Sequence, residues 1–205
     1  MKLFILGANG HTGTQIIDLA LIRNHQVTAF VRSPEKIRRQ HPLLNVVKGD
    51  PRSIDQLARS MKGHDAVLSA LGVRPPAAFR PHKVVRDCAT STAAAMSSEG
   101  IKRLVLVSAA VLFPMKGLMY AFFRQLLKHI ARDVDAAEQI VRGAAVDWTI
   151  ARPPRLTGGS GEHYQASRGS LPNGAFSMSF RAVAAFMLDA VEQHSYIYEI
   201  VGLGS

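Results

Sequence analysis

The sequence predicts a single α/β domain with a doubly wound, mostly parallel sheet flanked by helices. First, the apolar run of residues 2–6 leads directly into a glycine-rich turn and an amphipathic segment, the strand–turn–helix order of such a fold. Second, apolar runs with β-branched residues alternate with helical segments as far as the C-terminus. Third, residues 104–107 are all apolar, as a central parallel strand buried on both faces requires.

Composition limits the class of protein. At 205 residues the chain is long enough for one sizeable core and too short for a nucleotide domain plus a large separate substrate domain. No apolar run reaches the roughly 18 residues that span a bilayer, and the first residues form a strand rather than a signal peptide. The single cysteine, Cys88, excludes an internal disulfide and lies in an apolar pattern typical of a core residue. We expect a soluble, cytoplasmic protein without membrane insertion.

The glycine-rich turn is the first functional motif. Gly7, Gly10 and Gly13 are spaced three apart, with Asn9, His11 and Thr12 between them. Glycines let the backbone approach a pyrophosphate closely, and the free N–H groups at the start of the following helix, residues 14–23, attract negative charge. The motif therefore predicts a dinucleotide site, although an ordinary strand-to-helix turn would show the same glycines.

The end of the next strand, residues 26–31, predicts which dinucleotide is bound. An NAD site places an acidic residue about 20 positions beyond the glycines to bind the ribose 2′-hydroxyl. Here Arg32 stands 19 positions after Gly13, and Ser33 and Lys36 follow it. A basic residue with a neighbouring hydroxyl and a second cation suits a 2′-phosphate, so we expect NADP(H). The alternative interpretation is a solvated basic loop.

The net charge of +10 raises the question of nucleic-acid binding. The basic residues are dispersed, and the densest group, which includes Arg38 and Arg39, falls at the expected adenosine end of the cofactor. A small phosphate explains that group more economically, so we expect no nucleic-acid partner. The sequence also suggests no metal site.

The remaining elements follow in alternation. We expect strands over residues 43–48, 64–72, 103–108, 148–151 and 196–201, and helices over residues 53–61, 82–98, 134–142 and 180–192. Residues 152–157 form a proline-rich rigid exit, and residues 158–174, rich in Gly and Ser, form a mobile lid or surface loop. Residues from about 152 to 205 supply small substrate-side elements of the single domain.

Several candidate site residues lie where strands end, because ligands of open α/β sheets bind beyond the carboxyl ends of the strands. Asp50 could meet an adenine amino group, although an Asp-Pro turn is an equal alternative. Leu71 and Gly72 could pass under the cofactor's ribose, Arg74 could reach phosphate, and Ser108 could face the nicotinamide or a substrate oxygen. The apolar segment 117–130 is a core helix, a substrate wall or a subunit contact, and the last would make a homodimer.

The chain resembles the atypical short-chain dehydrogenases/reductases with an NmrA-like, Rossmann-type NAD(P)-binding domain. The resemblance rests on the glycine turn, Val31-Arg32, Gly49-Asp50, residues 101–108, Asp147-Trp148-Thr149-Ile150 and Arg152-Pro153-Pro154. It implies cofactor contacts by the glycine turn with Asn9, His11 and Thr12, and by Arg32, Asp50, Leu71, Gly72, Arg74, Ser108 and Pro153. Within that group, Leu71-Gly72-x-Arg74 and Ser108-Ala109 look most like the biliverdin-IXβ reductases, also called flavin reductases.

Catalysis departs from the regular pattern. Regular short-chain dehydrogenases pair a Ser with Tyr-x-x-x-Lys, in which the lysine lowers the tyrosine pKa. This chain has Ser108 but no such lysine; Tyr120 precedes Arg124 instead and is the candidate acid, or else an aromatic in an apolar helix. A missing Tyr-Lys pair favours a flavin, quinone or tetrapyrrole acceptor, to which hydride passes directly while solvent supplies the proton.

The sequence thus favours an NADPH-dependent reductase acting on a small aromatic or conjugated acceptor, with Arg155 contributing to the acceptor pocket. Two alternatives stay open. One is a non-catalytic NADP-binding sensor of the NmrA kind, which would use the same site without turnover. The other is a sugar-nucleotide epimerase or dehydratase, which usually needs a larger substrate domain and an intact Tyr-Lys pair.

Overall fold

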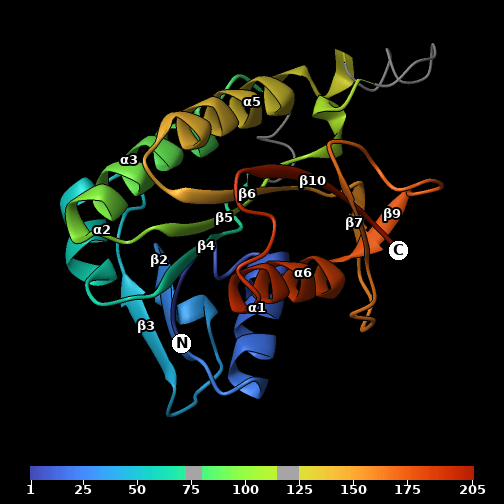
Figure 1. Ribbon diagram of the computed structural model, residues 1–205. Helices are drawn as coiled ribbons and strands as arrows, with labels where there is room; N and C mark the ends of the chain where they lie inside the picture. The colour runs from blue at the N-terminus through green and yellow to red at the C-terminus, as the bar shows by residue number, and fades with distance from the viewer. Residues whose placement is uncertain (73–79, 115–124) are drawn as a thin grey trace.

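A computed structural model describes residues 1–72, 80–114 and 125–205 (Figure 1). Its main sheet has eight strands in the order β3-β2-β1-β4-β5-β6-β10-β8. Their bounds are β1 Lys2–Leu6, β2 Gln26–Val31, β3 Leu44–Lys48, β4 Ala66–Ser69, β5 Arg103–Val107, β6 Asp147–Arg152, β8 Gln165–Arg168 and β10 Glu199–Gly204. All neighbouring pairs are parallel except β10 and β8, which are antiparallel. The predicted doubly wound, mostly parallel sheet is confirmed.

The helices cover both faces of this sheet. They are α1 His11–Ile22, α2 Ile54–Met61, α3 Val84–Glu99, α5 Lys128–Gly143 and α6 Phe180–Glu192, with short 3-10 turns η1 Pro34–Lys36 and η3 Ala110–Leu112. Figure 1 shows α1 beside α6 on one face, and α3 beside α5 and α2 on the other. Each face has its own apolar core, because alternate side chains of every strand point to opposite faces.

The strand order determines where a ligand can bind. β1 lies between β2 and β4, so the chain winds outward in one direction over β1–β3 and in the other over β4–β6. A crevice opens at this reversal, beyond the carboxyl ends of β1 and β4. The turn that leaves β1 is the glycine motif, so the topology places that motif at the crevice.

Helix ends agree with simple capping rules. Ser53 and Ser179 accept hydrogen bonds from the N–H groups of Gln56 and Ala182, which satisfies free donors at the starts of α2 and α6. Gly100 ends α3 with φ of +70°, a conformation that other residues adopt only with strain. β2 and α6 have the predicted bounds, whereas α1 and α5 begin earlier than expected, at His11 and Lys128.

Two predictions near the C-terminus are wrong. The last strand begins at Glu199 rather than Tyr196, because Tyr196 and Tyr198 adopt positive φ angles of 56° and 59° that no strand contains. The segment 158–174 is not wholly a loop, since it holds β8 on the sheet edge. Its Tyr164 hydroxyl also donates to Asp189 of α6 over 2.7 Å.

Residues 152–157 also differ from the predicted exit. Arg152 is the last residue of β6 and is buried. β7 (Arg155–Thr157) then pairs in parallel with β9 (Ser177–Ser179) to form a second, two-stranded sheet. The residues after 152 therefore contribute both to this small sheet and, through α6 and β10, to the main fold.

In the part of the chain that the structure describes, no helix is both long and apolar enough to cross a lipid bilayer.

Candidate functional site

The glycine turn is shaped by close backbone contacts. Gly7 has φ of +75°, and a Cβ added there would stand 2.5 Å from the carbonyl oxygen of Ala70, just beyond β4. A Cβ at Gly13 would stand 2.2 Å from the carbonyl oxygen of Gly7. No side chain fits at either position without displacing backbone, so these two glycines bring the β1 turn against the end of β4 and hold the start of α1 under it.

The start of α1 is suited to an anion. Gly10 is the N-cap residue and has no side chain that could occupy the first N–H groups of the helix, and the first turn carries no acidic residue. Those N–H groups and the positive end of the helix dipole favour a negatively charged ligand. The turn therefore fits the pyrophosphate of a dinucleotide.

The side chains of this turn differ in their surroundings. Thr12 is buried, and Asn9 has an interaction partner of its own. The His11 ring is exposed and stacks on the ring of Phe180, the first residue of α6, with centroids 4.9 Å apart. His11 thus links the cofactor turn to the helix that follows the small β7–β9 sheet.

A pocket of about 590 Å³ opens at the carboxyl ends of β2 and β3. Its lining carries three cations and one carboxylate; the residues are Arg32, Lys48, Gly49, Asp50, Gln56 and Arg59. Gly49 is required because the Phe30 ring packs within 2.1 Å of where its Cβ would lie. An excess of positive charge at this place suits a phosphate on the adenosine side of a dinucleotide.

The Asp50 carboxylate is already engaged. It accepts from the Arg52 backbone N–H at 3.0 Å, and its two oxygens pair with the Arg52 guanidinium at 3.1 and 2.9 Å. The hydrogen bonds from Arg52 hold the pKa of Asp50 below its ordinary value, with a further lowering from the charge of Arg32. Asp50 therefore forms the predicted Asp-Pro turn and also lines the pocket.

Ser33 and Lys36 follow Arg32 closely in the chain but are not among the residues that line this pocket. Ser33 precedes η1, and Lys36 ends it with an exposed side chain. The cations that line the pocket together with Arg32 are instead Lys48 and Arg59, which the sequence analysis did not single out. Each lies on a different element, β3 and α2, so no local motif marks them.

Ser108 lies directly after β5 and is part of a buried polar cluster. Its hydroxyl donates to Glu138 Oε1 of α5 at 2.5 Å. Glu138 is also held by Arg152, whose Nε and Nη2 donate to the two carboxylate oxygens at 2.9 and 2.6 Å. The Arg152 guanidinium stacks over the Phe113 ring, 4.7 Å from its centroid. The cluster joins the ends of β5 and β6 to α5.

This arrangement limits what Ser108 can do. A carboxylate only accepts hydrogen bonds, so the Ser108 hydrogen must point to Glu138. The oxygen keeps lone pairs for a donor on a ligand, but it does not offer its hydrogen to a substrate carbonyl. Sequence reasoning included Arg152 only in a motif and missed Glu138, because neither residue signals its long-range partner.

The other predicted residues are distributed around the same edge. Leu71 and Gly72 follow β4, and Pro153 is buried with its carbonyl accepting from the Ala110 N–H at 3.0 Å. Arg155 is exposed at the start of β7. Arg74 and Tyr120 lie outside the described residues.

The chain matches the NAD(P)H-binding family over residues 7–194. It belongs to that family. The family match begins at the first glycine of the turn and extends through α6, and NAD(P)(H) is the cofactor of this family.

Similar proteins agree with the family at the level of fold. An uncharacterized chloroplastic protein of Arabidopsis thaliana is 28% identical over 98% of this chain and 75% of its own length. An uncharacterized sugar epimerase of Bacillus subtilis is 26% identical over 76% of this chain and 72% of its own length. A short-chain dehydrogenase/reductase of Veillonella parvula, solved in complex with NADP, superposes with a TM-score of 0.78 at 19% identity, over 100% of this chain and 94% of its own.

Proposed function

We propose that this member of the NAD(P)H-binding family is an NADPH-dependent reductase. The observation that carries the proposal is the pocket at the ends of β2 and β3, where Arg32, Lys48 and Arg59 gather around a single carboxylate that is already paired. Such a pocket favours the 2′-phosphate of NADPH over the bare ribose hydroxyl of NADH. A phosphorylated, reduced dinucleotide is a hydride donor for reductive chemistry.

The cluster at Ser108 supports an acceptor that needs little help from a protein acid. NADPH supplies the hydride when bound, and Ser108, with its hydrogen held by Glu138, orients the cofactor by accepting from the carboxamide –NH₂ of the nicotinamide. Conjugated acceptors such as flavins, quinones or tetrapyrroles spread the incoming charge over many atoms, and solvent can supply their proton. They are the acceptor class that suits this chain, with Arg155 at the acceptor side.

The direct test is NADPH oxidation by the purified protein with FMN, a quinone and biliverdin as separate acceptors. If the protein is such a reductase, it should turn over with at least one of these acceptors, and more slowly when NADH replaces NADPH. Tight NADPH binding without turnover on any acceptor would contradict the proposal and leave an NADP-binding sensor as the better account.

The Bacillus relative's name makes a sugar-nucleotide epimerase the second candidate. That reaction first takes a proton from a sugar hydroxyl and later returns it, which needs a base beside the nicotinamide. Ser108 already donates its hydrogen to a buried, ion-paired carboxylate, which disfavours Ser108 as that base. Incubation with UDP-glucose and analysis for UDP-galactose would detect such an activity.

A further inference from the structure

A second pocket, of about 610 Å³, lies between the N-terminal halves of α3 and α5. Five of its lining side chains are basic or can become so, and one is acidic; the lining residues are Pro81, His82, Lys83, Arg86, His129, Arg132, Asp133 and Ala136. We call it the α3–α5 groove. It is separate from the cationic pocket at β2 and β3, with which it shares no residue.

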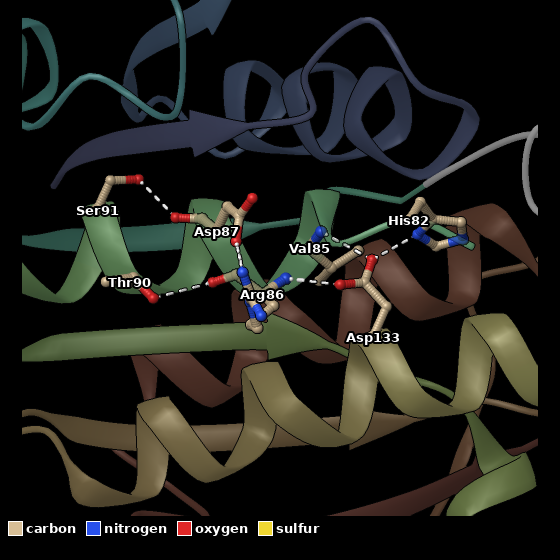
Figure 2. Close-up of polar contacts among 7 residues, drawn as sticks. All are labelled: His82, Val85, Arg86, Asp87, Thr90, Ser91 and Asp133. Carbon is tan, nitrogen blue, oxygen red and sulfur yellow. Dashed lines mark hydrogen bonds and ion pairs between the residues drawn. The ribbon is translucent and has the colours of Figure 1, made fainter.

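The one carboxylate of the groove is already engaged. Asp133 has a wholly buried side chain and accepts three hydrogen bonds, from the His82 Nδ1 at 2.7 Å and from the N–H groups of Val85 and Arg86 at 2.9 and 3.0 Å (Figure 2). Asp133 thus caps the start of α3 from the neighbouring helix, and its charge is stabilised by the N-terminal N–H groups of α3 and by the hydrogen bond from His82. It contributes little repulsion to an anion in the groove.

The cations, by contrast, are available. Among the described residues, Lys83 and Arg132 have no acidic partner within 4 Å, and both are exposed. Arg86 uses Nε and Nη2 to bind Asp87, which leaves its Nη1 without that partner (Figure 2). The groove therefore has an uncompensated positive charge on both of its walls.

His82 supplies an independent indication of a ligand. Because Asp133 only accepts, Nδ1 carries a hydrogen, and Nε2 lies on the side of the ring away from Asp133 (Figure 2). Within the described part of the chain, Nε2 is buried and has no hydrogen-bond partner. Buried polar atoms almost always have partners, and leaving one without costs about 1–3 kcal/mol. A ligand group in the groove that formed a hydrogen bond with Nε2 would remove that cost.

The groove lies at the functional edge of the sheet. α3 and α5 each connect parallel strands, so both helices begin at the carboxyl edge, where the glycine turn and Ser108 lie. Asp133 precedes Glu138, the partner of Ser108, by five residues on α5, which is about 7.5 Å along a helix axis. The groove therefore lies farther along α5 toward its N-terminus than the partner of Ser108.

We propose that the α3–α5 groove binds a carboxylate or phosphate group of the acceptor, through Arg132, Lys83 and the Nε2 of His82. This inference rests on the proposed reductase function for the identity of the ligand as an acceptor. It narrows that acceptor to one whose conjugated part reaches the nicotinamide while an anionic group extends over the starts of α3 and α5.

The binding test uses inorganic phosphate and needs no turnover. NMR follows the ring signals of His82 in the NADPH-saturated protein at constant pH and ionic strength. These signals are identified as the ones that disappear in the His82→Gln variant. Phosphate should shift them saturably and chloride should not. Arg132→Ser should weaken phosphate about tenfold, since it removes a charged hydrogen-bond donor. Arg142→Ser, at the exposed far end of the same helix, should leave the affinity unchanged. Absence of a saturable shift, or equal affinity in Arg132→Ser, would overturn the site.

Steady-state kinetics with two flavins tests whether the groove binds the acceptor. With FMN and riboflavin, which differ by one phosphate, Arg132→Ser should raise KM for FMN about tenfold at unchanged kcat and leave riboflavin unaffected. If neither flavin oxidises NADPH while phosphate still shifts the His82 signals, the anion site in the groove is supported and reduction of flavins is refuted. A different outcome is that both flavins are reduced, the ratio of KM for FMN to KM for riboflavin is the same in wild type and in Arg132→Ser, and phosphate does not shift the His82 signals. That outcome would overturn the anion site in the groove and leave the reductase function supported.

Discussion

Ser108 and Glu138 are joined by a 2.5 Å hydrogen bond in which the serine is the donor. Glu138 is in turn paired through both oxygens with Arg152, and its side chain is 2% exposed. This relationship reverses the usual expectation for a serine at the end of the fifth strand, which is to donate to a substrate. Here Ser108 can only accept from a bound ligand, and the nicotinamide carboxamide carries a suitable donor.

That reversal can be measured with a cofactor analogue. 3-Acetylpyridine-NADP lacks the carboxamide –NH₂, so wild-type protein should bind it roughly five- to tenfold more weakly than NADP, as one hydrogen bond of about 1–1.5 kcal/mol implies. Ser108→Ala should bind the two equally. Calorimetric titration of wild type and Ser108→Ala with NADP and with its acetylpyridine analogue gives the four dissociation constants from which the coupling between Ser108 and the carboxamide is calculated. An unchanged preference in Ser108→Ala would show that Ser108 does not contact the carboxamide.

The buried pair itself should be important for stability. Arg152→Ala leaves the Glu138 charge buried without its cation, which should lower the free energy of unfolding by about 3–5 kcal/mol. Arg168→Ala is the matched control, because Arg168 pairs with Glu199 at the surface and its side chain is 72% exposed; we expect a loss below about 1 kcal/mol. Urea unfolding measures both. The double variant Glu138→Met/Arg152→Met should recover most of the free energy of unfolding that Arg152→Ala loses. If it does not, the loss in Arg152→Ala is not electrostatic in origin.

Cys88 should be inert in the folded protein. Burial in α3 raises the pKa of its thiol to about 11 from the ordinary 9.0, with a smaller contribution from the charge of Asp50. At pH 8 the thiolate fraction is then about 100-fold lower than in the unfolded chain, so alkylation by iodoacetamide should be at least that much slower than in urea. Because the folded pKa is raised, wild type should lose stability relative to Cys88→Ala as the pH rises from 9 to 11. Rapid native labelling at pH 8 would contradict the buried placement.

The glycine turn gives a steric prediction. Gly13→Ala places a Cβ 2.2 Å from the Gly7 carbonyl oxygen, so the turn must move and NADPH binding should fall at least about tenfold. Gly143→Ala, at the end of α5, meets nothing within 4 Å and should change neither binding nor folding. Calorimetry for binding and thermal melting for stability separate the two effects. Normal affinity in Gly13→Ala would exclude this turn as the pyrophosphate site.

The sequence predicted those parts of the fold that depend on local patterns. α6 and β2 have local signals, a serine cap with an apolar helical stripe and a β-branched run, and both were placed at their observed bounds. The last strand was misplaced because the two tyrosines with positive φ look like strand residues, while Gly202 and Gly204 look like turn residues. In fact Gly202 is needed because Ser170 packs within 2.0 Å of its Cβ position, a long-range contact that has no local signal.

The residues of the candidate site likewise fall into those with a local sequence signal and those without one. The glycine turn and Arg32 could be found from spacing, because the motif is contiguous and the strand that follows is short. Lys48, Arg59 and Glu138 could not, since each comes from another element and becomes relevant only when the sheet order brings it to the edge. The dyad of His82 and Asp133 joins residues 51 positions apart, which likewise only packing reveals.

The most direct test of the account is the ratio of NADH to NADPH dissociation constants in wild type and in Arg32→Glu, with Arg142→Glu as the exposed control. If Arg32 binds the 2′-phosphate, wild type should favour NADPH, and Arg32→Glu should weaken NADPH by about 10- to 100-fold while NADH changes little, which reflects a lost charge-assisted contact of about 1.5–3 kcal/mol. Arg142→Glu should leave the ratio as in wild type. Equal weakening of both cofactors by Arg32→Glu, or no preference for NADPH in wild type, would contradict the account.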